Sequence, residues 1–181
     1  PKTAFTAQKI EFMLEVVKEQ DMYHSLSIEG YKITDNLIEK VTKGNWNPEL
    51  DDGDKKTKDA LAAKGYFEAF NEIKNDLIEE VTSSKYGHKF VEKLHSKWFV
   101  KLFTPSVQSG LLKASDLVGY RRHQVFIRNS QHVPLEECEL LDAMETYFEL
   151  LGNEKDPFVK AVLGHHLFGY IHPYMDGNGR M

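Results

Sequence analysis

The residues with the clearest chemical potential lie at the end of the chain, in the run HPYMDGNGRM. His172 carries the one side-chain type whose ordinary pKa is near neutrality, so it can take a proton from an attacking hydroxyl. Asp176 offers the carboxylate oxygen that Mg²⁺ prefers when it also binds phosphates. Arg180 offers a planar fork of N–H donors that matches phosphate oxygens. A base, a metal ligand and a phosphate-binding cation therefore stand within one short segment.

Two glycines between these residues predict a close approach of the backbone to a ligand. Gly177 and Gly179 can adopt positive φ, so successive N–H groups of the loop can point inward as an anion-binding nest. Asn178, between them, can also donate to phosphate through its amide. Taken alone, Asp-Gly-Asn-Gly is an ordinary turn and His172 a helix-end histidine. The complete ordered set favours a nucleotide site.

The segment resembles the signature of the Fic family, HxFx(D/E)GNGRxxR, whose members typically transfer AMP from ATP to a protein hydroxyl. Tyr174 stands where the family usually has Phe, and the chain stops at Met181, two residues before the family's second arginine. We therefore expect the chain to be truncated at its C-terminus. The positions in register with the signature are His172, Pro173, Asp176, Gly177, Asn178, Gly179 and Arg180.

The resemblance implies a protein adenylyltransferase. In this interpretation ATP is the substrate, Asp176 holds Mg²⁺, His172 is the catalytic base, and residues 177–180 bind the nucleotide. The acceptor is a Ser, Thr or Tyr hydroxyl of a target protein. Two alternatives stay open, namely a hydrolase of the same fold that removes AMP, and a non-catalytic module that binds nucleotide or peptide. The target, the nucleotide preference and any homo-oligomer are not determined by the sequence.

A second family pattern, (S/T)xxxE(G/N), fits the end of the first predicted helix. Ser25, Glu29 and Gly30 occupy its three defined positions. Alone, these residues are typical of any helix end, because glycine commonly terminates a helix. Upstream of a Fic-like signature they predict an inhibitory helix within residues 1–30. In this hypothesis Glu29 pairs with the family's second arginine beyond Met181 and blocks productive binding of ATP.

Residues 119–134 predict a short β-hairpin beside the site. Val125, Phe126 and Ile127 favour a strand, Asn129 and the serine after it can turn the chain, and Pro134 stops pairing. The Fic family has such a flap, which aligns the target segment by strand addition, and an exposed strand edge can bind an extended peptide. Three arginines of this region, Arg121, Arg122 and Arg128, could instead face nucleotide phosphates.

Apolar residues at helical spacing predict helices over most of the remaining chain. The predicted helices cover about residues 6–28, 34–42, 55–81, 90–102, 135–151 and 158–170, and residues 104–119 read as connecting loop. The last helix is apolar around most of its circumference, which predicts a buried position in a bundle. We expect an all-α, Fic-like domain of six to eight helices with one hairpin, spanning residues 1–181, with the signature loop at 172–181.

The composition limits the classes of protein to which the chain can belong. The 181 residues are 41% hydrophobic and 28% charged, which is typical of a soluble globular protein. A formal net charge of −5 argues against a nucleic-acid-binding domain. The single cysteine, Cys138, excludes an intrachain disulfide and suits the cytoplasm. No apolar run has the roughly 18 residues that a membrane span needs.

Overall fold

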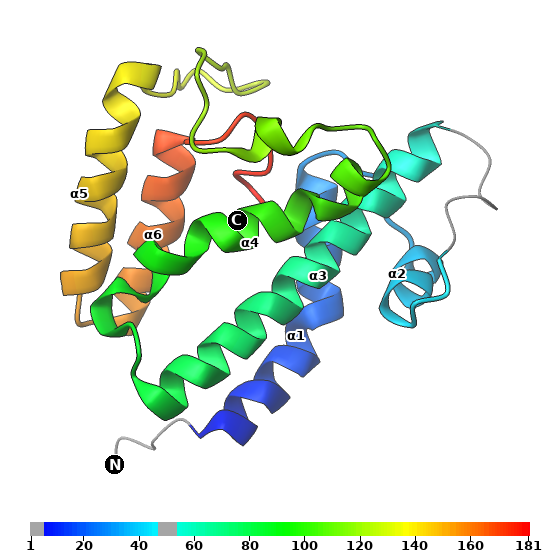
Figure 1. Ribbon diagram of the computed structural model, residues 1–181, viewed down its shortest axis with the longest axis horizontal. Coiled ribbons are helices and arrows are strands. Elements are labelled where there is room, and N and C mark those ends of the chain that lie inside the picture. The colour runs from blue at the N-terminus through cyan, green and yellow to red at the C-terminus, as the bar shows by residue number, and fades with distance from the viewer. Residues whose placement is uncertain (1–5, 47–53) are drawn as a thin grey trace. The chain divides into compact units, whose positions relative to one another are not determined.

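The computed structural model describes residues 6–46 and 54–181, with the side chains of residues 54–57 left out. The first five residues of the predicted inhibitory segment lie outside this range. Six α-helices and three short 3₁₀ helices form the described part, which contains no β-strand (Figure 1). The α-helices are α1 (Ala7–Ile28), α2 (Asp35–Thr42), α3 (Asp54–Ser83), α4 (Phe90–Gln108), α5 (Leu140–Asn153) and α6 (Pro157–Ile171). The 3₁₀ helices are η1 (Gly87–Lys89), η2 (Ala114–Leu117) and η3 (Glu137–Glu139).

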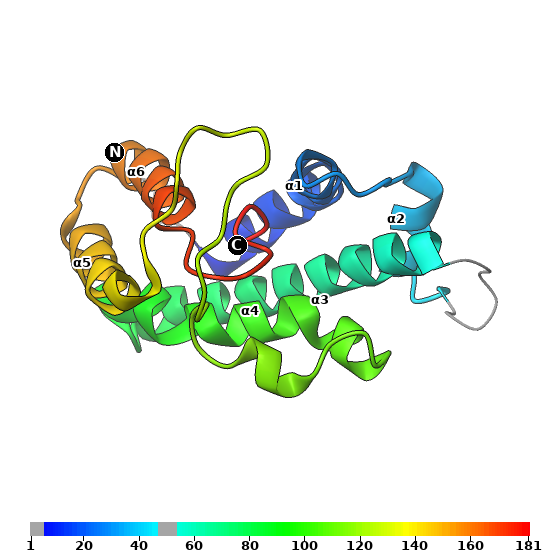
Figure 2. The same cartoon turned by 90° about the horizontal axis from the view of Figure 1, so that it is seen from above.

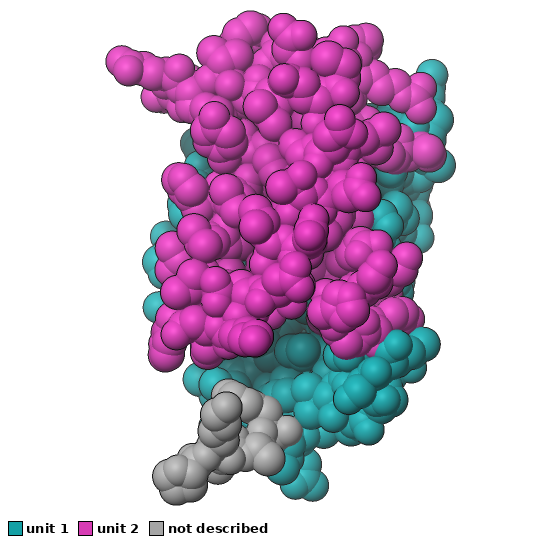
Figure 3. All heavy atoms as spheres, turned by 90° about the vertical axis from the view of Figure 1, so that its left-hand side faces the viewer, with its two compact units in different colours: residues 1–85, 96–117, 180 teal, residues 86–95, 118–179, 181 magenta. Residues whose placement is uncertain are grey.

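The chain divides into two compact units, coloured separately in Figure 3. Unit 1 contains residues 1–85 and 96–117 together with Arg180, and unit 2 contains residues 86–95 and 118–179 together with Met181. Helix α4 contributes residues 90–95 to unit 2 and the remainder to unit 1. The expected single domain over residues 1–181 stays a prediction.

Unit 1 is built on α1 and α3, which lie side by side in both views of the ribbon (Figures 1 and 2). Thr6 caps α1 because its hydroxyl accepts from the Lys9 N–H. The helix packs on its neighbours through Met22 and Leu26, both fully buried. The predicted first helix is therefore confirmed.

The end of α1 is a Schellman motif. Gly30 has φ +86° and donates its N–H to Ser27 O at 3.0 Å, while the Tyr31 N–H bonds Leu26 O at 3.1 Å. This positive φ is the conformation that glycine adopts without strain. The motif places Glu29 at the C-cap.

Helices α3 and α4 approach closely at Gly65. A Cβ atom at this position would lie 1.9 Å from the carbonyl oxygen of Leu102. No side chain larger than hydrogen fits such a contact with backbone, so Gly65 sets the distance between the helices at this point.

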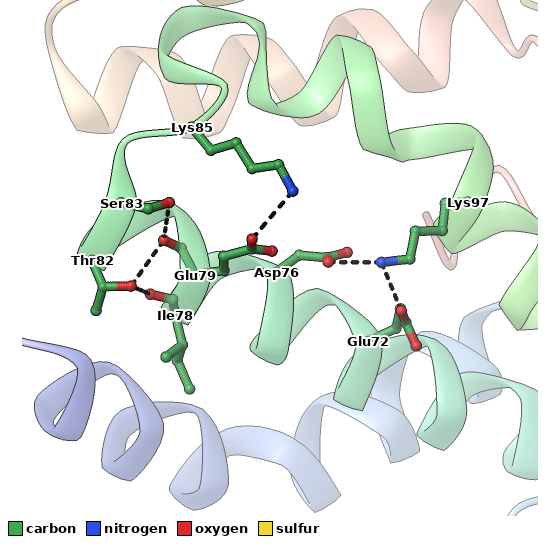
Figure 4. Close-up of polar contacts among 8 residues, drawn as sticks. All are labelled: Glu72, Asp76, Ile78, Glu79, Thr82, Ser83, Lys85 and Lys97. Atoms are coloured by element: carbon green, nitrogen blue, oxygen red, sulfur yellow. Dashed lines mark hydrogen bonds and ion pairs between the residues drawn. The ribbon is translucent and has the colours of Figure 1, made fainter.

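A buried carboxylate joins the same two helices. Asp76, 7% exposed, accepts from Trp98 Nε1 and from Lys97 Nζ, each at 2.7 Å. Figure 4 shows the Lys97 ammonium between Asp76 and Glu72, whose carboxylate lies 2.7 Å away. Because every oxygen of Asp76 has a donor, its burial costs far less than burial of an isolated charge.

Helix α4 is longer than its sequence predicts. The expected loop from residue 104 begins only after Gln108, and Pro105 lies inside the helix. Pro105 is fully buried, as is Leu102 nearby. Burial of this apolar surface outweighs the hydrogen bond that proline cannot donate.

Helices α5 and α6 lie entirely within unit 2 and are side by side in Figures 1 and 2. Asp156 caps α6 by accepting from the N–H groups of Phe158 and Val159, with Pro157 in the first turn. The apolar circumference of α6 had predicted a central helix. The prediction was wrong for the outer face, because Phe158 is 81% exposed.

The predicted β-hairpin at residues 119–134 is not formed, although this segment is fully described. The chain does turn at Asn129, with φ +61°, and the Ser130 N–H bonds Ile127 O at 3.1 Å. Side chains take the place of a backbone ladder, since Gln124 Nε2 donates to Val125 O at 3.2 Å and to Pro134 O at 2.8 Å. An isolated two-stranded hairpin is marginal, and Pro134 lacks an N–H for pairing.

Within the described residues, none of the helices combines the length and apolarity that crossing a bilayer requires.

Candidate functional site

Helix α6 ends at His172, which has a left-handed backbone conformation with φ 53° and ψ 59°. The His172 N–H still bonds Phe168 O at 2.9 Å, so this residue closes the helix. A non-glycine residue in this region costs roughly 1 kcal/mol, which the surrounding contacts must offset. The turn directs the chain away from the helix axis immediately after the predicted base.

The imidazole of His172 has the properties of a base. Its Nδ1 lies 3.4 Å from Gly169 O, and because a carbonyl oxygen only accepts, this contact favours the proton on Nδ1 and the lone pair on Nε2. Burial lowers the pKa of His172, and electrostatic interactions with Arg121 and His132 lower this pKa further. The Gly169 carbonyl and Asp176 act in the opposite direction. The ring is therefore neutral at pH 7 and able to accept a proton.

The signature loop is closed by its own side chains. The Asn178 amide accepts from the Tyr174 N–H at 2.9 Å and donates to Tyr174 O at 2.8 Å, and Asn178 is 5% exposed. The Met181 N–H bonds Gly177 O at 3.1 Å, and Gly177 has φ +81°. Asn178 thus shapes the loop with its side chain, so its backbone N–H is the group it can offer to a phosphate.

Tyr174 anchors this loop in unit 2. It is 2% exposed, and its ring packs against Phe168 at 6.2 Å and Tyr120 at 5.6 Å between centroids. Burial raises the pKa of Tyr174, so the hydroxyl stays neutral. The aromatic ring at this position therefore holds the loop in unit 2.

Asp176 is exposed, and its Oδ1 accepts from the Gly177 N–H at 2.8 Å. The described residues contain no group of three or more His, Cys, Asp or Glu side chains that could hold a metal ion on their own. A Mg²⁺ ion that is shared with substrate phosphates needs only one or two carboxylates. The single carboxylate beside a glycine loop fits this kind of metal binding.

Arg180 follows the loop in sequence and makes its contacts in unit 1. Its Nε lies 2.5 Å from Oε2 of Glu29, and the Arg180 side chain is 1% exposed. The guanidinium carbon lies 5.0 Å from the ring centroids of both Tyr31 and Phe103. Two aromatic rings and one carboxylate therefore hold the cation that the sequence assigned to phosphate.

The three inhibitory-motif residues have distinct positions. Glu29 is the C-cap of α1 and reaches Arg180, while Gly30 supplies the positive φ that ends the helix. Ser25 and Asp21 both hydrogen-bond the Tyr66 hydroxyl of α3. Ser25 therefore fixes the position of α1 on α3, and Glu29 carries the charge.

The predicted target-docking residues lie on a loop. Phe126 is 76% exposed, and Val125 and Ile127 are half-buried. Of the three nearby arginines, Arg122 and Arg128 are exposed, whereas Arg121 is 4% exposed. The burial of Arg121 could not be read from the sequence, because arginine is usually found at the surface.

The structure thus groups the predicted residues in two sets. Unit 2 contains the predicted base, the predicted metal-binding carboxylate and the glycine loop at residues 172–179, with the 119–134 loop. Unit 1 contains Ser25, Glu29 and Gly30 together with Arg180. Sequence reasoning missed Tyr31 and Phe103, because neither an aromatic residue after a helix end nor one within a helix gives a local sign of contact with a cation.

Comparison with known proteins is consistent with this geometry. The model of the Fic/DOC family matches residues 68–181. The chain is 24% identical over 174 residues to a probable protein adenylyltransferase of Aquifex aeolicus (strain VF5). That match covers 95% of this chain and 47% of the relative, so the chain spans about half the length of the curated protein.

Proposed function

Because this chain belongs to the Fic/DOC family, we propose that it is a protein adenylyltransferase that moves AMP from ATP to a hydroxyl of a target protein. The observation that carries the proposal is the position and chemistry of His172. It lies at the end of a helix, at the start of a glycine loop, with a lowered pKa and its Nε2 able to accept a proton. The relative named as a probable adenylyltransferase supports the same reaction.

The proposed reaction is a displacement at the α-phosphorus of ATP. The target hydroxyl oxygen attacks that phosphorus while His172 Nε2 takes the hydroxyl proton. The bond from the α-phosphorus to the oxygen bridging the β-phosphate breaks, and pyrophosphate leaves. Backbone N–H groups of residues 177–179 would neutralise phosphate charge as a nest. Asp176 would hold Mg²⁺, which would supply positive charge to stabilise the ATP phosphates.

The transfer activity is proposed to be inhibited by Glu29. The support is its 2.5 Å ion pair with Arg180, the cation that the signature motif assigns to phosphate. A carboxylate and a phosphate cannot use the same donors of one guanidinium at once. The pairing of Glu29 with Arg180 allows inhibition within this chain.

The target protein is proposed to dock at residues 125–127. The support is the exposure of Phe126 in a segment that begins next to the His172 loop, because the Arg121 N–H bonds Pro173 O at 2.9 Å. Without a strand ladder, the docking would rest on side chains rather than on strand addition.

Incubation with Mg²⁺ and ATP labelled at either the α- or the γ-phosphate tests the reaction. AMP transfer places the α-label on protein and releases the γ-label in pyrophosphate, whereas phosphorylation places the γ-label on protein and leaves the α-label in ADP. His172→Ala should lower α-labelling by roughly 10² to 10⁴ with ATP affinity nearly unchanged. Loss of AMP from a preloaded protein would favour the hydrolase, and ATP binding with neither activity would favour the binding module.

A further inference from the structure

Arg121 is a buried cation in unit 2 whose hydrogen bonds all go to backbone carbonyl groups. Its side chain donates from Nε to His172 O at 2.9 Å, from Nη1 to His123 O at 3.1 Å, and from Nη2 to Leu135 O. With 4% exposure and three nitrogens engaged in this way, the guanidinium is committed to the protein itself. It therefore does not fit the role of a phosphate ligand.

Two hydrogen bonds of Arg121 go to the carbonyl groups of consecutive residues at the end of α6. Its side-chain Nε bonds the His172 carbonyl, and its backbone N–H bonds the Pro173 carbonyl at 2.9 Å. The last carbonyls of a helix have no partner within the helix and carry partial negative charge. A buried cation at this position satisfies one of them and restrains the left-handed turn at His172.

The other two side-chain bonds reach both arms of the 119–134 loop region. His123 precedes the exposed segment at residues 125–127, and Leu135 follows it. The return arm has a second attachment, because His132 Nε2 lies 2.8 Å from Tyr170 O and its ring stacks on Tyr170 at 4.3 Å. One guanidinium thus connects the base to the two ends of the loop.

We propose that Arg121 is the positioning residue for His172, holding the base in its left-handed conformation and linking it to the proposed target-docking loop. This inference rests on the proposed transfer reaction for its catalytic meaning. The geometry itself is independent of that reaction, since every contact lies within unit 2.

The charges around His172 support this role. Burial lowers the pKa of His172, and Arg121 and His132, both from the loop, lower it further, while Asp176 from the signature loop raises it. Arg121 therefore adds to the effect of burial in lowering the pKa of the base, and its hydrogen bonds orient that base. Removing its charge should raise the pKa of His172, whereas replacing it with another cation should not.

Three variants separate orientation from charge. Arg121→Gln removes the cation and the fork, Arg121→Lys keeps the cation but can satisfy fewer carbonyls, and Arg122→Gln removes the neighbouring exposed cation as a matched control. The readouts are the pKa of His172 by NMR titration of its imidazole, hydrogen exchange of the residue 121 amide, and kcat and KM for AMP transfer.

We expect Arg121→Gln to raise the pKa of His172, and both Arg121 variants to speed exchange of the residue 121 amide. Each variant should lower kcat by on the order of 10 to 100-fold with little change in KM for ATP. Arg122→Gln should match the parent in the NMR and exchange measurements. If Arg121→Gln does not fold, Arg121→Lys alone tests the proposal. Faster exchange of its residue 121 amide together with an unchanged His172 pKa would support the proposal.

Folded Arg121 variants with the parental His172 pKa and parental amide exchange would overturn the proposal, as would parental kcat in both. The NMR and exchange measurements need no substrate. A protein that lacks AMP transfer would therefore refute the proposed function while leaving the test of Arg121 intact.

Discussion

Glu29 and Arg180 form an ion pair of 2.5 Å between Oε2 and Nε, with the arginine side chain 1% exposed and the glutamate side chain 16% exposed. A charge pair with so little water around it behaves differently from a surface salt bridge. Removing one partner leaves the other charge without compensation, at a cost of several kcal/mol when burial is retained. The pair therefore couples the conformation of Arg180 to the end of α1.

Glu29→Gly should raise AMP transfer by roughly tenfold or more, because Arg180 then has no carboxylate competing with phosphate. The same change should lower the free energy of unfolding by about 3 kcal/mol, since the arginine loses its partner. Transfer and thermal stability are measured together at equal ATP and Mg²⁺. Glu11→Gln, exposed on the same helix, is the control. Parental transfer in a destabilised Glu29→Gly protein would show that the pair is structural only.

Transfer should decline on the acid side as the pH falls through the lowered pKa of His172, below its ordinary value of 6.5. The physical reason is that the imidazolium form has no lone pair to accept the hydroxyl proton.

The lowered pKa of His172 also makes the free energy of unfolding depend on pH, because the unfolded chain binds this proton more readily. The stability contribution of neutral His172 is full above pH 6.5 and is lost as the pH falls toward the folded-state pKa. Measuring kcat and the free energy of unfolding over the same pH range tests both expected dependences. A decline of kcat that begins above pH 6.5 would contradict the assignment of His172 as the base.

Asp176→Asn should lower transfer by on the order of 10² and raise the Mg²⁺ concentration needed for half-maximal activity. The amide oxygen can still accept from the Gly177 N–H, so the loop conformation is expected to survive. Mg²⁺ titrations of parent and variant give the comparison. An unchanged Mg²⁺ requirement would mean that the metal is held by other groups.

Phe126→Ala should weaken modification of the target protein by roughly tenfold while leaving ATP binding unchanged, since an exposed aromatic ring is a common anchor in protein contacts. Phe158→Ala is the matched control, because Phe158 is 81% exposed and Phe126 is 76% exposed. Rates with target protein and affinity for ATP are measured for all three proteins. Equal losses in both variants would remove residues 125–127 from the docking site.

Gly65→Ala should destabilise the protein by about 1 to 3 kcal/mol or prevent folding, because the new methyl group meets the Leu102 carbonyl at 1.9 Å. Gly169→Ala provides the contrast. Its Cβ would meet no atom within 4 Å, so on α6 it should stabilise by about 0.5 to 1 kcal/mol. Chemical denaturation of both variants tests the close approach of α3 to α4, and similar stabilities would contradict it.

Local signals in the sequence were sufficient to locate the helices and to recognise the family, although not to place the end of α4. Thr6, Thr34 and Asp156 begin helices because their side chains cap nearby N–H groups, and Gly30 ends one because it takes positive φ without strain. These effects act within a few residues, so they can be read from a single segment. The ordered run from His172 to Arg180 was recognised for the same reason, and the family match agrees with it.

Only the tertiary structure decided the contacts between residues distant in sequence. Arg121 looked like its neighbour Arg122, yet packing buries one and exposes the other. The hairpin was predicted from strand propensity, but the side chains of Gln124 and Arg121 satisfy carbonyls that a ladder would have used. Arg180 was assigned to phosphate, and it lies instead against Glu29, Tyr31 and Phe103. These contacts depend on which buried charges and carbonyl groups lie close together in the folded chain. A pattern within one short segment of sequence does not determine this.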